Sequence, residues 1–214
     1  ALSGTVSIAI LSIQAGSVLD AGVFRIMALP SFNTSGSGVL RVQSAAADAL
    51  PDDQNWSFTV QYDGSVLQTV SRGSFNGGVV VNNPSGATLK GATTMAALTL
   101  AAGNLILNNN RLTLNGTFRG AASNALVGSA LSDLTIGGQA GTLYFRNSGR
   151  GNLLRHLRFE AGATATLGNT LNITSGSEAG TVTVTATSKL YSNGQLVLQS
   201  DSIGTARVAE ITGC

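Results

Sequence analysis

Apolar and polar residues alternate with a period of two along most of this chain, in short runs such as 6–10, 58–62, 141–145 and 181–184. Alternation of this kind places one set of side chains inward and the other outward, which is typical of β-strands. Ala-Gly, Asn-Gly, Ser-Gly and Gly-Gly pairs interrupt the runs and permit the positive φ of tight bends. The pattern therefore predicts an all-β protein built from short strands.

A short phrase recurs along the chain. Leu-Thr-Leu-Ala-Ala-Gly at 98–103 is followed, after eight residues, by Leu-Thr-Leu at 112–114. A second copy at 157–162 and 171–173 aligns with the first without a gap, and looser copies begin at Leu11 and Val182. We interpret each copy as two strands joined by a small-residue bend. Such a unit cannot bury its apolar face alone, so the copies are expected to stack.

A slower period joins the copies. Apolar residues recur at nearly even intervals, at Leu19, Val42, Val66, Leu89, Leu112, Leu134, Leu157 and Val182. An interval of this length accommodates three strands and three bends, which is one coil of a parallel β-helix with layers about 4.8 Å apart. The sequence therefore predicts a β-solenoid of about nine coils, right-handed by the crossover rule. An antiparallel β-sandwich is the alternative, because Asn-Gly and Asp-Gly pairs suit hairpins as well as solenoid corners.

One segment departs from the alternation. In residues 43–57, a group of alanines is followed by Pro51 and the pair Asp52-Asp53. We expect this segment to be a loop that projects from the stack. The rest of 1–214 is expected to form a single elongated domain, a fragment of a larger protein. Neither end carries a charged, helical or proline-rich cap, so we expect flanking domains or further copies to cover the ends.

The composition narrows the functional classes. Charged residues make up 10% of the chain, against about 25% in ordinary domains. The formal net charge of +2 gives no strong field for a nucleic acid or a membrane surface. Every apolar run is too short to span a bilayer. The single Cys214 has no partner in the chain, so disulfides do not hold the fold. We predict no nucleic-acid partner and no membrane insertion.

The chain offers little catalytic chemistry. A glycosidase needs two carboxylates across a cleft, yet the ten acidic residues are scattered, and we expect the adjacent pair Asp52-Asp53 to lie in a solvated loop. His156 is the only histidine, which supports neither a metal site nor a serine triad. We therefore predict no catalytic residue, no metal and no cofactor. A polysaccharide lyase or glycosidase, whose acids converge only on folding, is kept as an alternative.

One stretch concentrates positive charge. Arg146, Arg150, Arg155 and Arg158 fall within thirteen residues, close to Tyr144. Guanidinium groups in this number could bind an anionic glycan or the carboxylates of a partner protein. A solvated face is the ordinary interpretation of such a run. These five residues form the candidate patch for a ligand or a partner.

Several segments resemble a known kind of module. The runs "GATTMAALTLAAGNLILNNNRLTLNGTF" at 91–118 and "LSDLTIGGQAGTLYF" at 131–145, with 58–91, 157–184 and 194–213, look like the β-helical stalks of very large secreted surface proteins of Bacteroidota. That family includes adhesins, and its stalks often lead to a sorting domain for type IX secretion. The resemblance implies a non-catalytic structural or adhesive segment at the cell surface, with flanking domains, surface glycans or the secretion machinery as partners. A filament-forming solenoid subunit is a further alternative.

Overall fold

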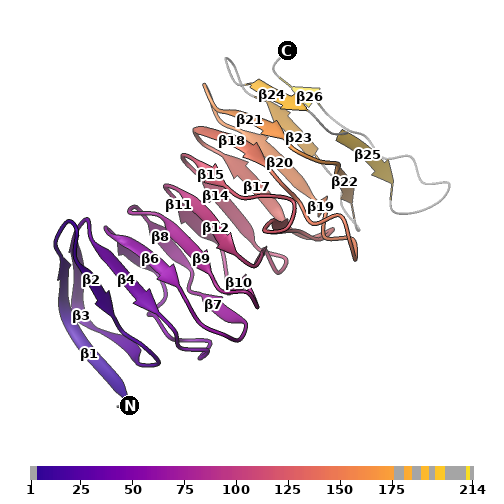
Figure 1. The fold of residues 1–214 in the computed structure, drawn as a ribbon. Helices are drawn as coiled ribbons and strands as arrows, with labels where there is room; N and C mark the ends of the chain where they lie inside the picture. Colours follow the sequence, from indigo (N-terminus) through magenta and orange to yellow (C-terminus); the bar gives the residue numbers. More distant parts are fainter. Residues whose placement is uncertain (1–3, 176–180, 185–188, 193–195, 201–210, 213–214) are drawn as a thin grey trace.

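The computed structural model describes residues 4–175, 181–184, 189–192, 196–200 and 211–212, and the chain winds as a β-solenoid (Figure 1). All paired strands of this part are parallel, and the one antiparallel contact within it is an isolated bridge between Ala121 and Asn124. The predicted parallel β-helix is therefore confirmed, with about eight turns against the nine expected, and the antiparallel sandwich is wrong. No helix occurs among the described residues, so none there is long and apolar enough to cross a membrane.

From β5 (Gln54–Trp56) onward each turn places strands on three sides, because consecutive strands belong to different sides and every third strand returns to the same one. Before β5 every second strand returns to the same sheet. The longest side is an eight-stranded sheet made of β5 (Gln54–Trp56), β8 (Gly73–Phe75), β11 (Thr93–Met95), β14 (Arg111–Leu114), β17 (Asp133–Ile136), β20 (His156–Phe159), β23 (Thr181–Val184) and β26 (Ile211–Thr212).

The second side is a six-stranded sheet made of β2 (Val18–Asp20), β4 (Val39–Val42), β6 (Thr59–Tyr62), β9 (Val79–Asn82), β12 (Leu98–Ala102) and β15 (Phe118–Arg119). Next to β15, a three-stranded sheet continues this side with β18 (Gln139–Leu143), β21 (Thr164–Leu167) and β24 (Lys189–Ser192).

The third side is made of β7 (Gln68–Val70), β10 (Ala87–Leu89), β13 (Leu105–Ile106) and β16 (Leu126–Val127), followed by β19 (Leu153–Leu154), β22 (Leu171–Ser175) and β25 (Leu196–Ser200). At the N-terminal end, β1 (Thr5–Ile13) and β3 (Arg25–Gly36) form a separate pair.

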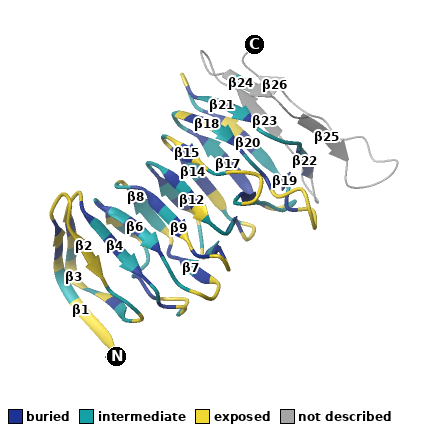
Figure 2. Cartoon of the chain, viewed as in Figure 1, coloured by how far each residue is buried: buried dark blue, intermediate teal, exposed yellow. Residues whose placement is uncertain are grey.

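The alternating pattern builds one continuous core that runs from Leu11 to Ile173. Inward side chains stack in rows across the strands, and Figure 2 shows the resulting alternation of buried and less buried positions. On the six-stranded side, Leu40, Val60 and Leu98 belong to one such row and are fully buried. Burying a leucine side chain contributes about 2 kcal/mol, so each row stabilises the contact between successive turns.

The expected slower period holds for the second half of its series. Leu112, Leu134, Leu157 and Val182 are register partners on β14, β17, β20 and β23. The first half is wrong, because the earlier turns are shorter than the later ones: Gln54 pairs with Gly73, and Gly73 pairs with Thr93. Turn length varies along the rod, so a fixed interval cannot describe all of it.

The recurring phrase spans three strands, which corrects the expectation of two. Between the strands β12 and β14 of the first copy lies β13, only two residues long, and β21 takes the same place in the second copy. The glycines of the three clearest copies, Gly16, Gly103 and Gly162, have φ of 75°, 74° and 77°. The phrase therefore marks a corner with a left-handed glycine. It does not mark one side of the rod, because β12 lies on the second side and β20 on the eight-stranded side.

Residues 43–53 contain no strand, as expected of a loop, and 54–56 form β5, but part of the segment packs against the core. Leu50 and Trp56 are buried, at 2% and 0% exposure, and β5 pairs with β8. Trp56 contacts Phe32, Phe58 and Phe75, with ring centroids 5.6 to 6.3 Å apart. Burial of large apolar side chains thus holds this polar-looking segment against the core.

Candidate functional site

The predicted arginine patch is divided between two sides of the solenoid. Arg155 and Arg158 lie at β20, on the eight-stranded sheet. Arg146 and Arg150 are exposed in the connection between β18 and β19, where Arg146 Nε donates to Ser148 Oγ at 3.1 Å. Tyr144 is half-buried and packs against the core. Of the five predicted residues, only Arg155 and Arg158 therefore lie at the same strand.

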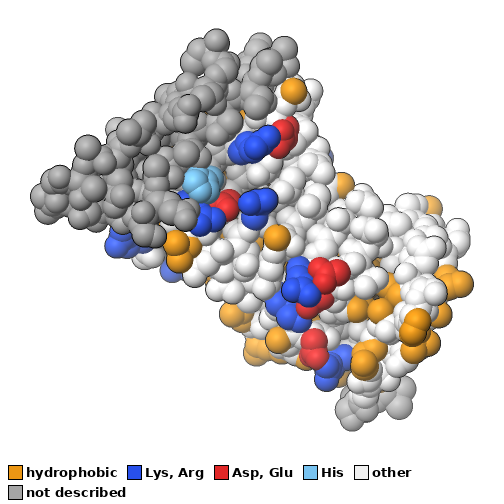
Figure 3. Space-filling model, turned by 180° about the vertical axis from the view of Figure 1, so that it is seen from behind, with side chains coloured by type: hydrophobic (Ala, Val, Ile, Leu, Met, Phe, Trp, Pro, Cys, Tyr) orange, Lys and Arg blue, Asp and Glu red, His pale blue; other side chains and the backbone are white. Residues whose placement is uncertain are grey.

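Arg158 lines a groove on the outer face of the eight-stranded sheet. The groove has a volume of about 510 Å³. Three adjacent strands line it: Arg111 and Thr113 on β14, Asp133, Leu134 and Thr135 on β17, and His156, Arg158 and Glu160 at β20. Figure 3 shows the histidine beside basic and acidic side chains on this face.

Arg111 and Asp133 were not predicted as site residues. They are register partners on β14 and β17, and Asp133 is in turn the partner of His156 on β20. One full turn of the rod separates Arg111 from Asp133, as it separates Leu112 from Leu134. The spacing between the two leucines was the signal that could have placed the two charges side by side.

Asp133 is the electrostatic centre of the groove. Its side chain is 9% exposed, and Arg155 binds it through two hydrogen bonds, Nε to Oδ1 at 3.0 Å and Nη2 to Oδ2 at 2.8 Å. Such a bidentate pair fixes both groups and satisfies most of the carboxylate. Arg111 lies further away, with Nε 4.0 Å from Oδ2 of Asp133, and its side chain is 63% exposed.

Arg158 forms a weaker pair with Glu160, which directly follows the same strand. Nε lies 2.9 Å from Oε1, and the two side chains are 54% and 43% exposed. Solvent screens a pair of this kind, so it contributes little to stability. The lining of the groove holds two arginines, Arg111 and Arg158, and two carboxylates, Asp133 and Glu160, so these charges balance. Arg111 is the more exposed of the two cations and lies further from its carboxylate.

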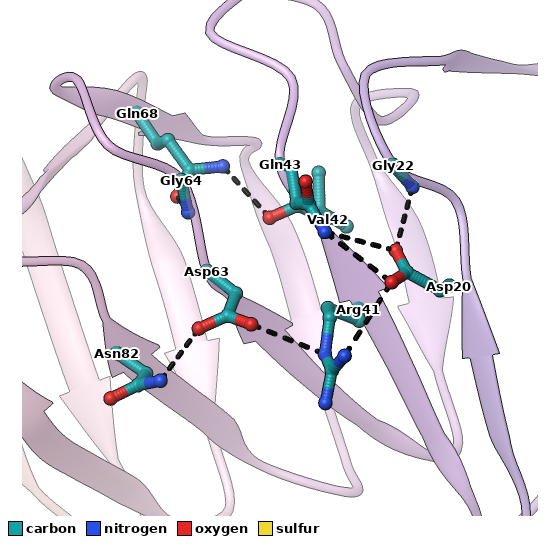
Figure 4. A network of polar contacts seen from close by, with 9 residues as sticks. All are labelled: Asp20, Gly22, Arg41, Val42, Gln43, Asp63, Gly64, Gln68 and Asn82. Carbon is teal, nitrogen blue, oxygen red and sulfur yellow. Dashed lines mark hydrogen bonds and ion pairs between the residues drawn. The ribbon is translucent and has the colours of Figure 1, made fainter. Parts of the chain in front are cut away.

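A second polar network joins turns on the six-stranded side (Figure 4). Arg41 on β4 lies between two carboxylates, with Nη1 3.5 Å from Asp20 Oδ2 and Nε 3.2 Å from Asp63 Oδ2. Asn82 on β9 donates to the other oxygen of Asp63 at 2.6 Å. The four side chains link four successive turns of the rod, which indicates a structural role for this network.

A buried amide locks the neighbouring corner. Gln68 is 0% exposed, and its Nε2 donates to the carbonyl oxygens of Val42 and Ser44 at 2.9 and 3.2 Å. Its Oε1 accepts from Gly64 N at 2.7 Å and from Asn83 Nδ2 at 3.0 Å. Gln68 therefore satisfies groups from three turns at a point where the strand ladders are interrupted.

The acidic pair Asp52-Asp53 is engaged by cations. Lys90 Nζ lies 2.7 Å from Asp52 Oδ2, and Arg72 Nη2 lies 2.8 Å from Asp53 Oδ2. A second pocket of about 340 Å³ holds Asp52 with Asp48, Lys90 and Arg25, and Arg25 is ion-paired with Asp48.

Each of the two pockets thus holds two carboxylates with basic partners, and among the described residues no three His, Cys, Asp or Glu side chains form a metal-binding group. Glu178, Asp201, Glu210 and Cys214 lie outside the described residues.

Comparison of the chain with protein-family models, with curated proteins and with solved structures finds no match. The interpretation of the site therefore depends on its geometry alone.

Proposed function

We propose that this chain is a non-catalytic structural and adhesive segment, a stalk or presentation rod of a bacterial cell-surface or secreted protein. The observation that carries the proposal is the uninterrupted core, in which stacked inward rows join turn to turn from Leu11 to Ile173. Charged and amide side chains such as Arg41 and Gln68 add bonds between turns. A rod built this way resists bending and keeps whatever it carries at a fixed distance.

The resemblance noted in 58–213 gives the proposal its finer form: a stalk module of large Bacteroidota surface proteins exported by type IX secretion. Antibodies raised against the folded chain should then label intact cells of the source organism. Protease treatment of intact cells should remove the signal. Labelling that requires permeabilised cells would refute the surface location.

A second candidate function is self-assembly, and the N-terminal end favours it. Seven of the ten exposed large apolar side chains of the described residues fall between Val6 and Leu29. Within that part of the chain β1 pairs only with β3 and β2 only with β4, so both strands present an open edge. β1 contains neither a charge nor a proline, the usual protections of an edge.

Sedimentation of the chain over a range of concentrations tests the assembly function. If β1 and β2 pair with a second copy, the wild type should associate as concentration rises, and Val6→Lys with Leu19→Lys should remain monomeric. Val66→Lys, at a position 54% exposed outside this end, is the matched control and should associate like the wild type. A wild type that is monomeric throughout would exclude a filament subunit.

A further inference from the structure

A row of hydroxyl groups crosses the outer face of the eight-stranded sheet, and its members Thr113 and Thr135 line the groove. Ser74, Thr94, Thr113 and Thr135 are register partners on β8, β11, β14 and β17, and all four are half-buried on the outer face. Arg158 continues the row on β20. Strand stacking spaces these groups by about 4.8 Å along the axis of the rod. The row therefore offers hydrogen-bonding groups at a regular interval, at right angles to the strands.

Arg111 stands beside this row with its guanidinium group available. Among the described residues its side chain takes part in no hydrogen bond, and its one ion pair is the 4.0 Å approach to Asp133, which Arg155 already satisfies. The corner before it is fixed, because the side-chain amides of Asn108 and Asn110 both donate to the carbonyl oxygen of Leu89 at 3.2 Å. The backbone before Arg111 is therefore already ordered, and binding has to order only the arginine side chain.

We propose that this groove binds a linear acidic polysaccharide lying along the rod. Arg111 and Arg158 hold carboxylate or sulfate groups of the chain, and Thr113 and Thr135 bond to sugar hydroxyls. A pyranose unit advances a chain by a length close to the layer spacing, so successive units meet successive strands. Polysaccharide binding by the groove is independent of the proposed function as a stalk.

The lining of the groove disfavours other polymers. The described residues that form it include no Phe, Tyr or Trp on which nucleic-acid bases could stack, and they present two guanidinium groups and not an extended basic channel. A peptide that adds as a strand needs a sheet edge, yet β14, β17 and β20 are each paired on both sides. Sugar hydroxyls and spaced anions are the partners that this surface satisfies best.

Calorimetric titration of the 214-residue chain with polygalacturonate, dextran sulfate and neutral dextran tests the proposal. We expect one or both acidic polymers to bind, neutral dextran not to bind, and salt to weaken the interaction. Arg111→Gln should weaken binding about tenfold, which is the loss of one charge-assisted hydrogen bond, and Arg111→Gln with Arg158→Gln should abolish it. Thr135→Val should cause a smaller loss. Arg119→Gln is the matched control, because Arg119 is exposed on β15 of another side and should not affect binding.

Three results would overturn the proposal. They are equal binding of neutral dextran, an equal loss in Arg119→Gln and in Arg111→Gln, and tighter binding of a single-stranded oligonucleotide than of either acidic polymer. The labelling of intact cells does not depend on these outcomes. The experiments can therefore refute polysaccharide binding and the surface-stalk function separately.

Discussion

Leu19 lies in register with Leu40 on the next strand, yet Leu19 is 41% exposed and Leu40 is fully buried. The two leucines occupy the same row, so they differ in exposure because β2 is the edge strand of its sheet. Leu40→Ala should lower the free energy of unfolding by about 2–5 kcal/mol, whereas Leu19→Ala should cost less than about 1 kcal/mol. Urea denaturation of both variants measures this. Equal losses would mean that another layer covers Leu19 in solution.

Gly16 and Gly103 occupy the same place in the recurring phrase and share a φ near 75°. A Cβ on Gly103 would lie 2.0 Å from the carbonyl oxygen of Asn83, whereas a Cβ on Gly16 would meet nothing within 4 Å. Gly16→Ala should therefore cost about 1 kcal/mol from the left-handed backbone alone. Gly103→Ala should cost several times more, as measured by thermal unfolding. Similar losses of stability in the two variants would show that the cost comes from the left-handed backbone angle and not from the contact with Asn83.

Asp133 and Glu160 provide a matched pair of acids in the groove. Asp133→Asn removes the charged carboxylate that Arg155 binds through two hydrogen bonds in a largely buried position, and we expect it to reduce stability by about 1–3 kcal/mol. Glu160→Gln breaks an exposed pair and should change stability by less than about 0.5 kcal/mol. Chemical denaturation at low and high salt distinguishes the two. A salt-sensitive loss in Glu160→Gln as large as that in Asp133→Asn would contradict this assignment.

Gln68 should be costly to replace because four hydrogen bonds end on its amide. Gln68→Met fills a similar volume but leaves the carbonyl groups of Val42 and Ser44 and the amide of Gly64 unsatisfied. We expect a loss of about 3 kcal/mol in the free energy of unfolding. Gln61→Met on the outer face of β6 is the control and should stay within about 0.5 kcal/mol of the wild type. A near-neutral Gln68→Met would show that water replaces the amide.

Tyr62 should make the fold sensitive to alkali. Burial raises the pKa of its phenol above the ordinary value of 10.0, and the neighbouring Ser71 offsets part of the rise. The unfolded chain releases the phenol proton first, so the stabilisation is complete below about pH 10 and is lost as the pH rises through the pKa of the folded state. Tyr62→Phe has no phenol proton and does not lose stability in this way. Its free energy of unfolding relative to the wild type should therefore be higher at about pH 11 than at about pH 8. If the free energies of unfolding of the variant and the wild type differ by the same amount at both pH values, other groups cause the sensitivity to alkali.

The sequence predicted the parts of the fold that local chemistry determines. Alternation placed the strands, and the glycine of the recurring phrase placed corners at Gly16 and Gly103. The two-residue strand β13 was missed, because two residues carry no periodicity. The burial of Leu50 and Trp56 within residues 43–57 was not predicted, because the nearby aspartates and proline indicate a loop and the burial of Trp56 depends on distant aromatic rings.

The candidate site is assembled across neighbouring turns of the rod. Arg155 and Arg158 are close in sequence and were predicted. Arg111 and Asp133 are one full turn apart, as are Leu112 and Leu134, whose spacing the sequence shows. The earlier turn that joins Gln54 to Gly73 is shorter, so no single period places every residue of the rod. Half of the groove was not predicted because its charges come together across turns and not within one stretch of sequence.

The connections between the third side and the eight-stranded sheet lengthen from two residues after β7 to five after β16, while the strand register is kept. The additional residues of these longer connections thus lie at the corner between two strands, and the apolar rows of the strands keep their register. Foreign peptides grafted at 128–132 or 146–150 would be displayed at heights set by the strands beneath them. The molecule could accordingly serve as a ruler on which epitopes are mounted at chosen spacings.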